Sequence, residues 1–181
     1  MNILIDNKEA DFREISFPIL IHGAEKTGTS FFSICLLANL VKSGMQALIF
    51  SAYPAAKEEF RKQIIGYEDN CIIIDSGEEQ VFIEALKNIH DLDDRVVLIK
   101  NIDKYTVDLF NAVSNLKLVI FSGDLDNCEF ANNLVSKNIS SKILFSPSEK
   151  YPQYDLVGLP QYYGKIFSDQ YNGVINLDTE K

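Results

Sequence analysis

The chain has 181 residues, a length that predicts one domain with a substantial hydrophobic core. Hydrophobic residues make up 46% of it and charged residues 24%, as in ordinary globular proteins. The formal net charge of −9 argues against nucleic acid as a partner, because a sequence-independent DNA surface depends on lysine and arginine contacts to phosphates.

The sequence also predicts a cellular compartment. The first residues show no basic stretch followed by an apolar one, so we expect no signal peptide. The longest apolar run, around residues 31–41, is too short to cross a bilayer, which argues against a membrane as partner. The three cysteines lie far apart and form no metal-ligand pattern, so we assign no metal ligands. We therefore expect a cytoplasmic protein with reduced, mostly buried thiols.

The predicted elements begin with residues 2–17, which favour a short strand or hairpin leading into a core at residues 18–146. Short runs rich in Ile, Val and Leu recur through this core. Their nearly continuous apolar character is typical of strands buried on both faces of a parallel sheet. The predicted strands are Pro18–His22, Gln46–Ser51, Cys71–Asp75, Arg95–Lys100, Leu116–Phe121 and Lys142–Phe145.

Helix-length segments separate these strands. The predicted helices are Ser30–Lys42, Ala55–Ile65, Glu78–Ile89, Tyr105–Ser114 and Asn127–Ser136. Ser76 and Glu79 form a capping-box pattern at the start of the third helix. This alternation predicts an α/β fold of three layers around a mostly parallel central sheet.

The last residues, 147–181, predict a C-terminal extension of the same single domain, 1–181. Within it, Tyr162–Phe167 and Gly173–Leu177 flank a polar turn and predict a β-hairpin. Five tyrosines gather in this extension, and we expect them to pack in the core or at a subunit interface. They are Tyr151, Tyr154, Tyr162, Tyr163 and Tyr171.

The most specific motif follows the first core strand. Gly23 and Gly28 have the Gly-x-x-x-x-Gly spacing of a phosphate-binding loop, and Ser30 closes the motif. Such a loop points backbone N–H groups and a helix N-terminus at one place, which favours phosphate. Thr29, however, stands where the loop lysine belongs. Lys26, three positions earlier, either reaches the phosphates in its stead or points into solvent.

In these features the chain resembles the RecA-like P-loop ATPases, the group of RecA, RadA, KaiC and the hexameric replicative helicases. The likeness covers roughly residues 17–145. GAEKTGTS is similar to the family's GPESSGKT-type loop, VVLIKNID to its Walker B strand, and KLVIFSGD to the next strand, which carries a polar sensor residue. The resemblance implies ATP as ligand, bound by Gly23, Glu25, Lys26, Thr27, Gly28, Thr29 and Ser30.

The chain departs from the family's pattern at each charged catalytic position. The loop lysine is Thr29, the catalytic glutamate falls at Tyr53, and the metal-holding aspartate falls at Lys100. The sensor position falls at Ser122 or Gly123. These losses argue against Mg²⁺ and against turnover, because phosphoryl transfer depends on such groups. We therefore expect a degenerate domain, a pseudo-ATPase with at most weak nucleotide binding and a scaffold or regulatory role, and assign no catalytic residues.

Lys100 leaves two arrangements open. Its ammonium group either enters the site and replaces the missing positive charge, and even Mg²⁺, or pairs with a carboxylate such as Glu25 or Asp124. A second alignment takes Asp103 as the Walker B acid, which would make the chain an unconventional ATPase that uses Lys26 and Asp103.

A third hypothesis is a sulfotransferase-like enzyme. KTGTSFF is similar to the 5′-phosphosulfate loop of the sulfotransferases, of the form Lys-Ser-Gly-Thr-Thr. That family also needs a serine and an arginine near a later strand, whereas residues 119–126 offer Ser122 and no arginine. RecA-like domains commonly assemble into rings or filaments, so the first resemblance implies a protein partner or a homo-oligomer.

Overall fold

A mixed β-sheet runs through the whole molecule. The computed structural model describes residues 2–24, 26–154, 156, 159–160 and 162–178. Its strands are β1 (Asn2–Ile5), β2 (Lys8–Glu9), β3 (Ile19–His22), β4 (Gln46–Ser51), β5 (Cys71–Ile73), β6 (Arg95–Lys100), β7 (Val119–Gly123), β8 (Ser141–Leu144), β9 (Gly164–Phe167) and β10 (Asn172–Asp178). Within the described chain they form one sheet in the order β2-β1-β10-β9-β8-β3-β7-β6-β4-β5. The six neighbouring strands β8, β3, β7, β6, β4 and β5 run parallel to one another. Beyond β8, the strands β9, β10, β1 and β2 continue the sheet in antiparallel pairs.

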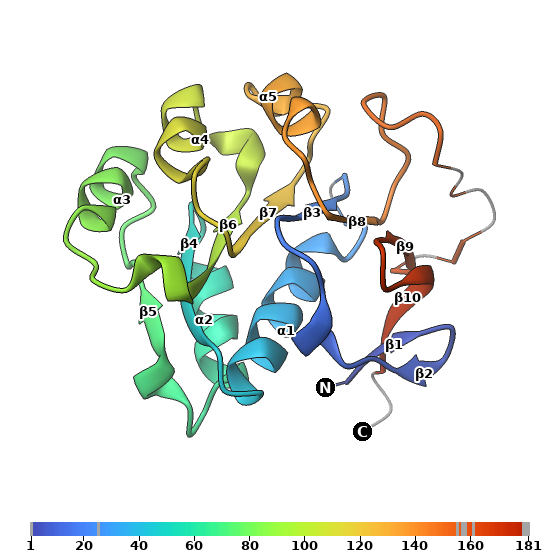
Figure 1. Ribbon diagram of the computed structural model, residues 1–181, viewed down its shortest axis with the longest axis horizontal. Coiled ribbons are helices and arrows are strands. Elements are labelled where there is room, and N and C mark those ends of the chain that lie inside the picture. Colours follow the sequence, from blue (N-terminus) through green and yellow to red (C-terminus); the bar gives the residue numbers. More distant parts are fainter. Residues whose placement is uncertain (1, 25, 155, 157–158, 161, 179–181) are drawn as a thin grey trace.

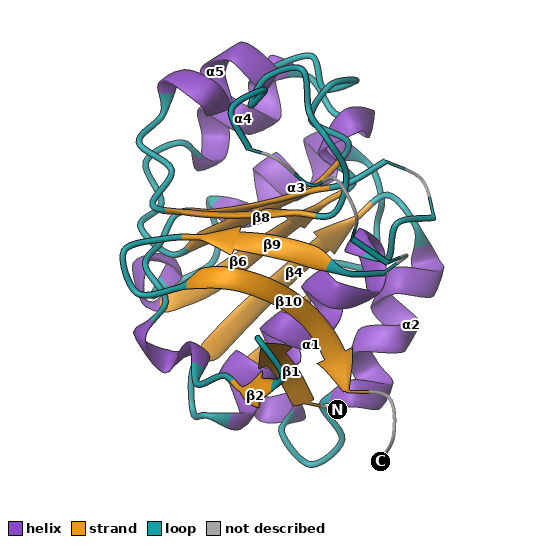
Figure 2. Cartoon of the chain, turned by 90° about the vertical axis from the view of Figure 1, so that its right-hand side faces the viewer, coloured by secondary structure: helices purple, strands orange, loops and turns teal. Residues whose placement is uncertain are grey.

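Helices cover both faces of the parallel part. Two of them, α1 (Thr29–Lys42) and α2 (Pro54–Gln63), pack on one face, and α3 (Glu79–Leu86), α4 (Val107–Val113) and α5 (Ala131–Ser136) pack on the other (Figure 1). Figure 2 shows α4 and α5 on one side of the sheet and α1 and α2 on the other. The short 3₁₀ helices are η1 (Phe12–Glu14), η2 (Glu68–Asn70), η3 (Leu92–Asp94) and η4 (Ile102–Lys104). The predicted α/β class with a mostly parallel sheet is confirmed.

The alternation of side chains explains why the central strands are apolar throughout. In β6, Val96 and Leu98 belong to the core beneath α1 and α2, whereas Val97 and Ile99 belong to the core beneath α3, α4 and α5. All four are fully buried. Strands β4 and β6 have the predicted bounds, since both faces of each strand are covered.

Two predictions about helix starts are wrong. The helix expected from residue 127 begins at Ala131, because the backbone before it forms turns: the amide of Cys128 donates to the carbonyl oxygen of Leu125 at 3.2 Å, and the amide of Ala131 to that of Cys128 at 3.1 Å. The capping box at Ser76 does not form either. Glu79 opens α3, but its carboxylate accepts hydrogen bonds from Thr106 and Leu109 at the start of α4.

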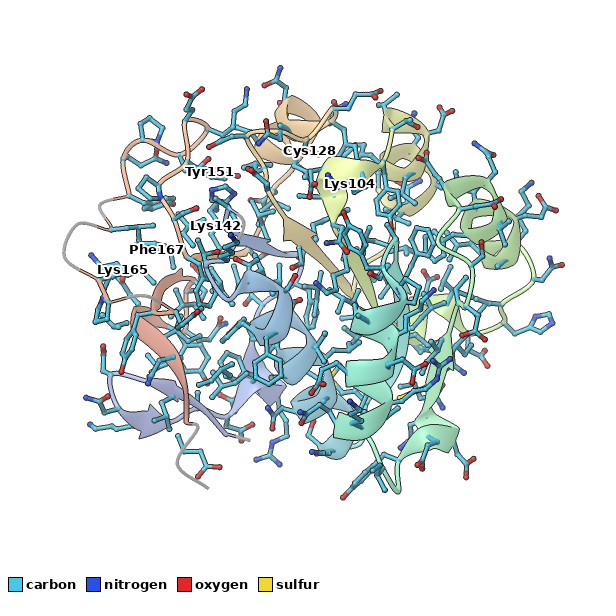
Figure 3. The ribbon with its side chains drawn as sticks, turned by 180° about the vertical axis from the view of Figure 1, so that it is seen from behind. Lys104, Cys128, Lys142, Tyr151, Lys165 and Phe167 are labelled. Atoms are coloured by element: carbon cyan, nitrogen blue, oxygen red, sulfur yellow. The ribbon has the colours of Figure 1, made fainter. Side chains whose placement is uncertain are left out.

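Both predicted terminal hairpins exist, and both extend the central sheet. Ile3 of β1 pairs with Leu177 of β10, so the two ends of the chain meet in neighbouring strands. In the extension that precedes β9, Tyr151 is buried and Tyr154 is half-buried, whereas Tyr162 is exposed. The Lys142 ammonium lies 5.8 Å from the ring centre of Tyr151 (Figure 3), and Tyr154 stacks on Phe167 with ring centres 4.1 Å apart. Of the helices described, none is both long and apolar enough to cross a membrane.

Candidate functional site

A cavity opens where the carboxyl ends of β3, β6 and β7 meet the N-terminus of α1. Its volume is about 740 Å³. One wall is the predicted loop, residues 23–24 and 26–31. The opposite wall consists of Tyr53, residues 100–101 and 103–104, residues 122–124, Asn127 and Tyr162. The structure thus brings the described loop residues to the same cavity as the three positions at which the sequence departs from the P-loop pattern. Glu25, which the resemblance assigned to the site, lies outside the described residues.

Two glycines set the shape of the loop. Gly28 precedes α1 with φ of +94°, a conformation that residues with a β-carbon rarely adopt. A β-carbon on Gly23 would lie 1.9 Å from Thr29 Oγ1, so no larger residue fits there without movement. The amide of Phe31 already donates to the carbonyl oxygen of Gly28 at 3.1 Å, whereas Thr29 and Ser30, which line the cavity, precede this first bond of the helix. This arrangement offers backbone donors to an anion.

The loop threonines bond to each other. Thr27 Oγ1 donates to the carbonyl oxygen of Ala24 at 2.8 Å and lies 2.8 Å from Thr29 Oγ1. Because the Thr27 proton is committed to Ala24, the Thr29 hydroxyl donates to Thr27. Thr29 is buried, and its side chain supplies no positive charge in place of the loop lysine. Lys26 is exposed beside the cavity, with a backbone φ of +66°.

A buried polar row crosses the sheet below the loop. Ser51 of β4 is in register with Lys100 of β6, and Lys100 with Ser122 of β7. Their exposed fractions are 0%, 2% and 1%. Each comes two residues after a side chain of the core beneath α1, so all three belong to the face that α1 covers. The last position of three adjacent strands on this face is therefore polar.

Lys100 is the buried cation of the site. Its ammonium nitrogen donates to Ser30 Oγ at 2.7 Å. Burial lowers the pKa of Lys100 from 10.5 to about 8, and the charge of Asp103 opposes this shift. In the described residues no carboxylate oxygen lies within 4 Å of the ammonium nitrogen, so the ion pair with Asp124 left open above does not form. The other carboxylate considered above, Glu25, lies outside the described residues, and Lys100 lines the cavity.

Asp103 also lines the cavity, but it does not end a strand. Strand β6 ends at Lys100, and Asp103 lies in η4. Its Oδ2 lies 3.0 Å from Lys104 Nζ, and its Oδ1 accepts from the amide of Asp124 at 3.4 Å. Lys104 is labelled in Figure 3. Lys100, not Asp103, is therefore the residue that ends the strand.

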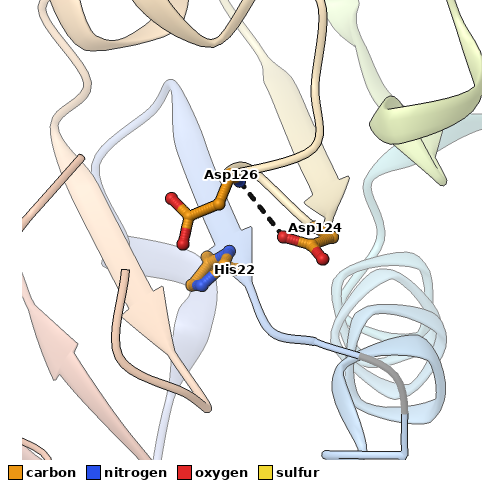
Figure 4. Close-up of side chains that lie close together, drawn as sticks. All are labelled: His22, Asp124 and Asp126. Atoms are coloured by element: carbon orange, nitrogen blue, oxygen red, sulfur yellow. Dashed lines mark hydrogen bonds between the residues drawn. The ribbon is translucent and has the colours of Figure 1, made fainter. Parts of the chain in front are cut away.

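His22 and two aspartates form a second cluster of candidate ligands beside the loop (Figure 4). Atoms of His22, Asp124 and Asp126 lie within 4.8 Å of one another. The amide of Leu125 donates to His22 Nδ1 at 3.0 Å, so Nδ1 is an acceptor. His22 Nε2 therefore carries the proton and lies 3.3 Å from the carbonyl oxygen of Pro147. Neither ring nitrogen is left for a metal.

The carboxylates of this cluster are also engaged. Asp124 accepts from the amide of Asp126 and from Asn127 Nδ2, the latter at 2.7 Å. Asp126 accepts from Ser148 Oγ at 2.7 Å and from the amide of Glu149 at 3.1 Å. These bonds tie the turn after β7 to the turn after β8. The close approach of His22, Asp124 and Asp126 is therefore explained by the hydrogen bonds that hold these turns together.

Three residues of the site escaped the sequence analysis. Ser51 belongs to the polar row. The sequence feature that could have identified it is a polar residue at the end of a predicted strand, two positions after the apolar Ile49. Tyr162 packs on Gly28: a β-carbon there would lie 3.1 Å from its ring. Tyr162 is 59% exposed, and nothing in the local sequence brings it to the loop. Asn101 accepts from Ser51 Oγ at 3.0 Å and has φ of +65°, which asparagine tolerates.

No protein-family model matches this chain, and no curated protein matches its sequence.

Proposed function

We propose that this chain is a degenerate RecA-like P-loop domain that binds a nucleotide weakly, does not hydrolyse it, and acts as a scaffold or regulatory subunit. The observation that carries the proposal is the hydrogen bond from the Lys100 ammonium to Ser30 Oγ at the N-terminus of α1. It places a buried cation beside backbone donors in a cavity of about 740 Å³. Backbone amides, a helix N-terminus and an ammonium group together favour a phosphate.

The absence of turnover is argued from the three altered positions. Hydrolysis needs a positive charge on the β- and γ-phosphates, a carboxylate for the metal and a group that orients water. Thr29 is bonded within the loop, Lys100 is a cation where the carboxylate belongs, and Tyr53 cannot act as a carboxylate base. Losing these groups together removes most of the electrostatic stabilisation of the transition state.

An unconventional ATPase is the second candidate, since Lys26 and Asp103 line the same cavity. Lys26 would supply the charge on the phosphates, and Asp103 would hold the metal or the water. The contact of Asp103 with Lys104 weighs against this role, because it neutralises the carboxylate. A turnover assay separates the two candidates.

The test combines binding and hydrolysis on the full chain. Calorimetry with ATP and with ADP is expected to give heat that Gly28→Val abolishes, because the substitution distorts the loop. Phosphate release is expected to be no faster than with Gly28→Val. Hydrolysis that Gly28→Val abolishes would overturn the proposal in favour of the second candidate. The 3′-phosphoadenosine 5′-phosphosulfate cofactor, titrated in the same way, tests the sulfotransferase hypothesis.

The scaffold or regulatory role implies a protein partner or a second copy of the chain. Light scattering coupled to size-exclusion chromatography, with and without ATP, measures self-association directly. A nucleotide-dependent change in mass is the result expected of a regulatory subunit that assembles with itself. A monomer under both conditions would direct the search to other proteins.

A further inference from the structure

The structure disagrees with a magnesium site at the loop. In a working P-loop, the hydroxyl of the residue that Ser30 matches is a ligand of Mg²⁺. Here the oxygen of that hydroxyl already accepts a hydrogen bond from the Lys100 ammonium at 2.7 Å. A divalent cation at this oxygen would lie next to the positive charge of the buried Lys100 ammonium, and the two charges would repel each other. Ser30 and Lys100 therefore do not fit Mg²⁺.

Resting on the proposed function, we propose that the Lys100 ammonium replaces the metal, so that the site binds the metal-free form of a nucleoside triphosphate and Mg²⁺ weakens the binding. The triphosphate without Mg²⁺ carries the larger negative charge, and it presents bare oxygens to the ammonium. The complex with Mg²⁺ would have to shed its metal first.

Burial and charge around Lys100 support this assignment. The side chain is 2% exposed, and none of the described carboxylates lies within 4 Å of its nitrogen. A buried ammonium without a neutralising partner is costly, and a bound anion would remove that cost. Asp103 contributes an attractive charge, but its carboxylate pairs with Lys104.

Ser122 gives an independent indication of a ligand. It is in register with Lys100 on the same face, is 1% exposed, and lines the cavity. Its hydroxyl oxygen is buried and has no hydrogen-bond partner in the described structure. Buried polar groups without partners are rare in native proteins, and a phosphate oxygen in this cavity would accept from this hydroxyl.

The experiment is calorimetric titration of the full chain with ATP, in EDTA and in saturating MgCl₂ at matched ionic strength. We expect ATP to bind in EDTA and to bind about tenfold more weakly with Mg²⁺, as expected when a charged hydrogen bond is lost. Lys100→Met, which keeps the length of the side chain, is expected to lose about tenfold in affinity in EDTA. Tripolyphosphate should compete with ATP in EDTA.

Lys57→Met is the matched control. Lys57 is also 2% exposed and donates to the backbone carbonyl of Asp75, but it does not line the cavity. This variant is expected to bind ATP as the wild type does, and circular dichroism checks that both variants fold. If Lys100→Met does not fold, the comparison of EDTA with Mg²⁺ on the wild type decides alone.

The remaining outcomes separate the two proposals. Binding that requires Mg²⁺, that is equally tight with and without it, or that Lys100→Met leaves unchanged would overturn the metal-free site while the proposed nucleotide binding stands. Binding of neither ATP nor ADP under either condition would overturn both.

Discussion

The ammonium nitrogen of Lys100 lies 2.7 Å from the hydroxyl oxygen of Ser30 and joins the end of β6 to the first turn of α1. The two residues are seventy positions apart in sequence, yet the parallel sheet brings the ends of its strands to one edge. Lys100 is the middle member of the buried row that Ser51 and Ser122 complete. A buried cation with two serines beside it in register is suited to an anion that delivers the missing negative charge.

Gly28→Val is expected to abolish nucleotide binding and to lower the free energy of unfolding by about 1–2 kcal/mol, the cost of a left-handed backbone for a residue with a β-carbon. The new side chain would also meet the ring of Tyr162. Calorimetry with ATP and urea unfolding measure the two effects.

Gly44→Val is the control for the backbone cost. Gly44 has φ of +102°, but a β-carbon there meets nothing within 4 Å, and the residue does not line the cavity. It should lose similar stability and keep its affinity for ATP. Loss of ATP binding in both variants would mean that general destabilisation, not the loop, explains the result.

Glu79→Ala is expected to destabilise the protein by about 1–2 kcal/mol, because it removes the cap of a neighbouring helix. The Glu79 carboxylate accepts from the Thr106 amide at 2.9 Å and from the Leu109 amide at 3.0 Å. Urea unfolding measures the change. Glu84→Ala on the same helix removes only an exposed ion pair with Lys87 and should change stability by less than about 0.5 kcal/mol. Equal effects of the two substitutions would contradict the capping role.

Glu79 illustrates what the sequence alone does not predict, namely the contacts between neighbouring helices. The spacing from Ser76 suggested a cap inside one helix, whereas the carboxylate caps α4, and only the packing of α3 against α4 decides between the two. Among the strands buried on both faces, β4 and β6 have the expected bounds because apolar character alone defines them. Strand β7 covers Val119–Gly123 and not the expected Leu116–Phe121, so apolar character did not define its start.

For the candidate site too, the sequence predicts what depends on a local pattern and not what depends on distances between elements. The loop residues follow a local spacing, so their place at the N-terminus of α1 could be read directly. Whether Lys100 bonds to Ser30 or to Asp124 depends on distances between β6, β7 and the loop, which no local pattern contains. The approach of Tyr162 to Gly28 depends likewise on the path of the C-terminal extension.

His22→Leu is expected to cost about 1–3 kcal/mol, because the amide of Leu125 loses its only described acceptor in a buried position. Urea unfolding again gives the value. His90→Leu is the matched control. His90 is exposed and follows α3, so its replacement should leave the free energy of unfolding nearly unchanged. If Zn²⁺ raised the melting temperature of the wild type but not of His22→Leu, the cluster would be a metal site, contrary to its structural explanation.

The stability of the wild type relative to Lys100→Met is expected to rise between pH 7 and pH 10. Burial lowers the pKa of Lys100 to about 8 in the folded protein, whereas the unfolded chain keeps the ordinary value of 10.5. Above pH 8 the folded protein therefore releases a proton that the unfolded chain retains, and stability increases with pH. The gain should be on the order of 2 kcal/mol.

Other ionisable groups at the cavity are present in both proteins, so the difference in stability between the two proteins isolates Lys100. These groups are Lys26, Tyr53, Asp103, Lys104, Asp124 and Tyr162. Urea unfolding of both proteins at several pH values, without ligand, makes the measurement. A difference in the free energy of unfolding that stays constant from pH 7 to pH 10 would mean that the pKa of Lys100 is not lowered, because a negative charge of the protein already compensates its ammonium group. The cavity would then lack the net positive charge on which anion binding depends.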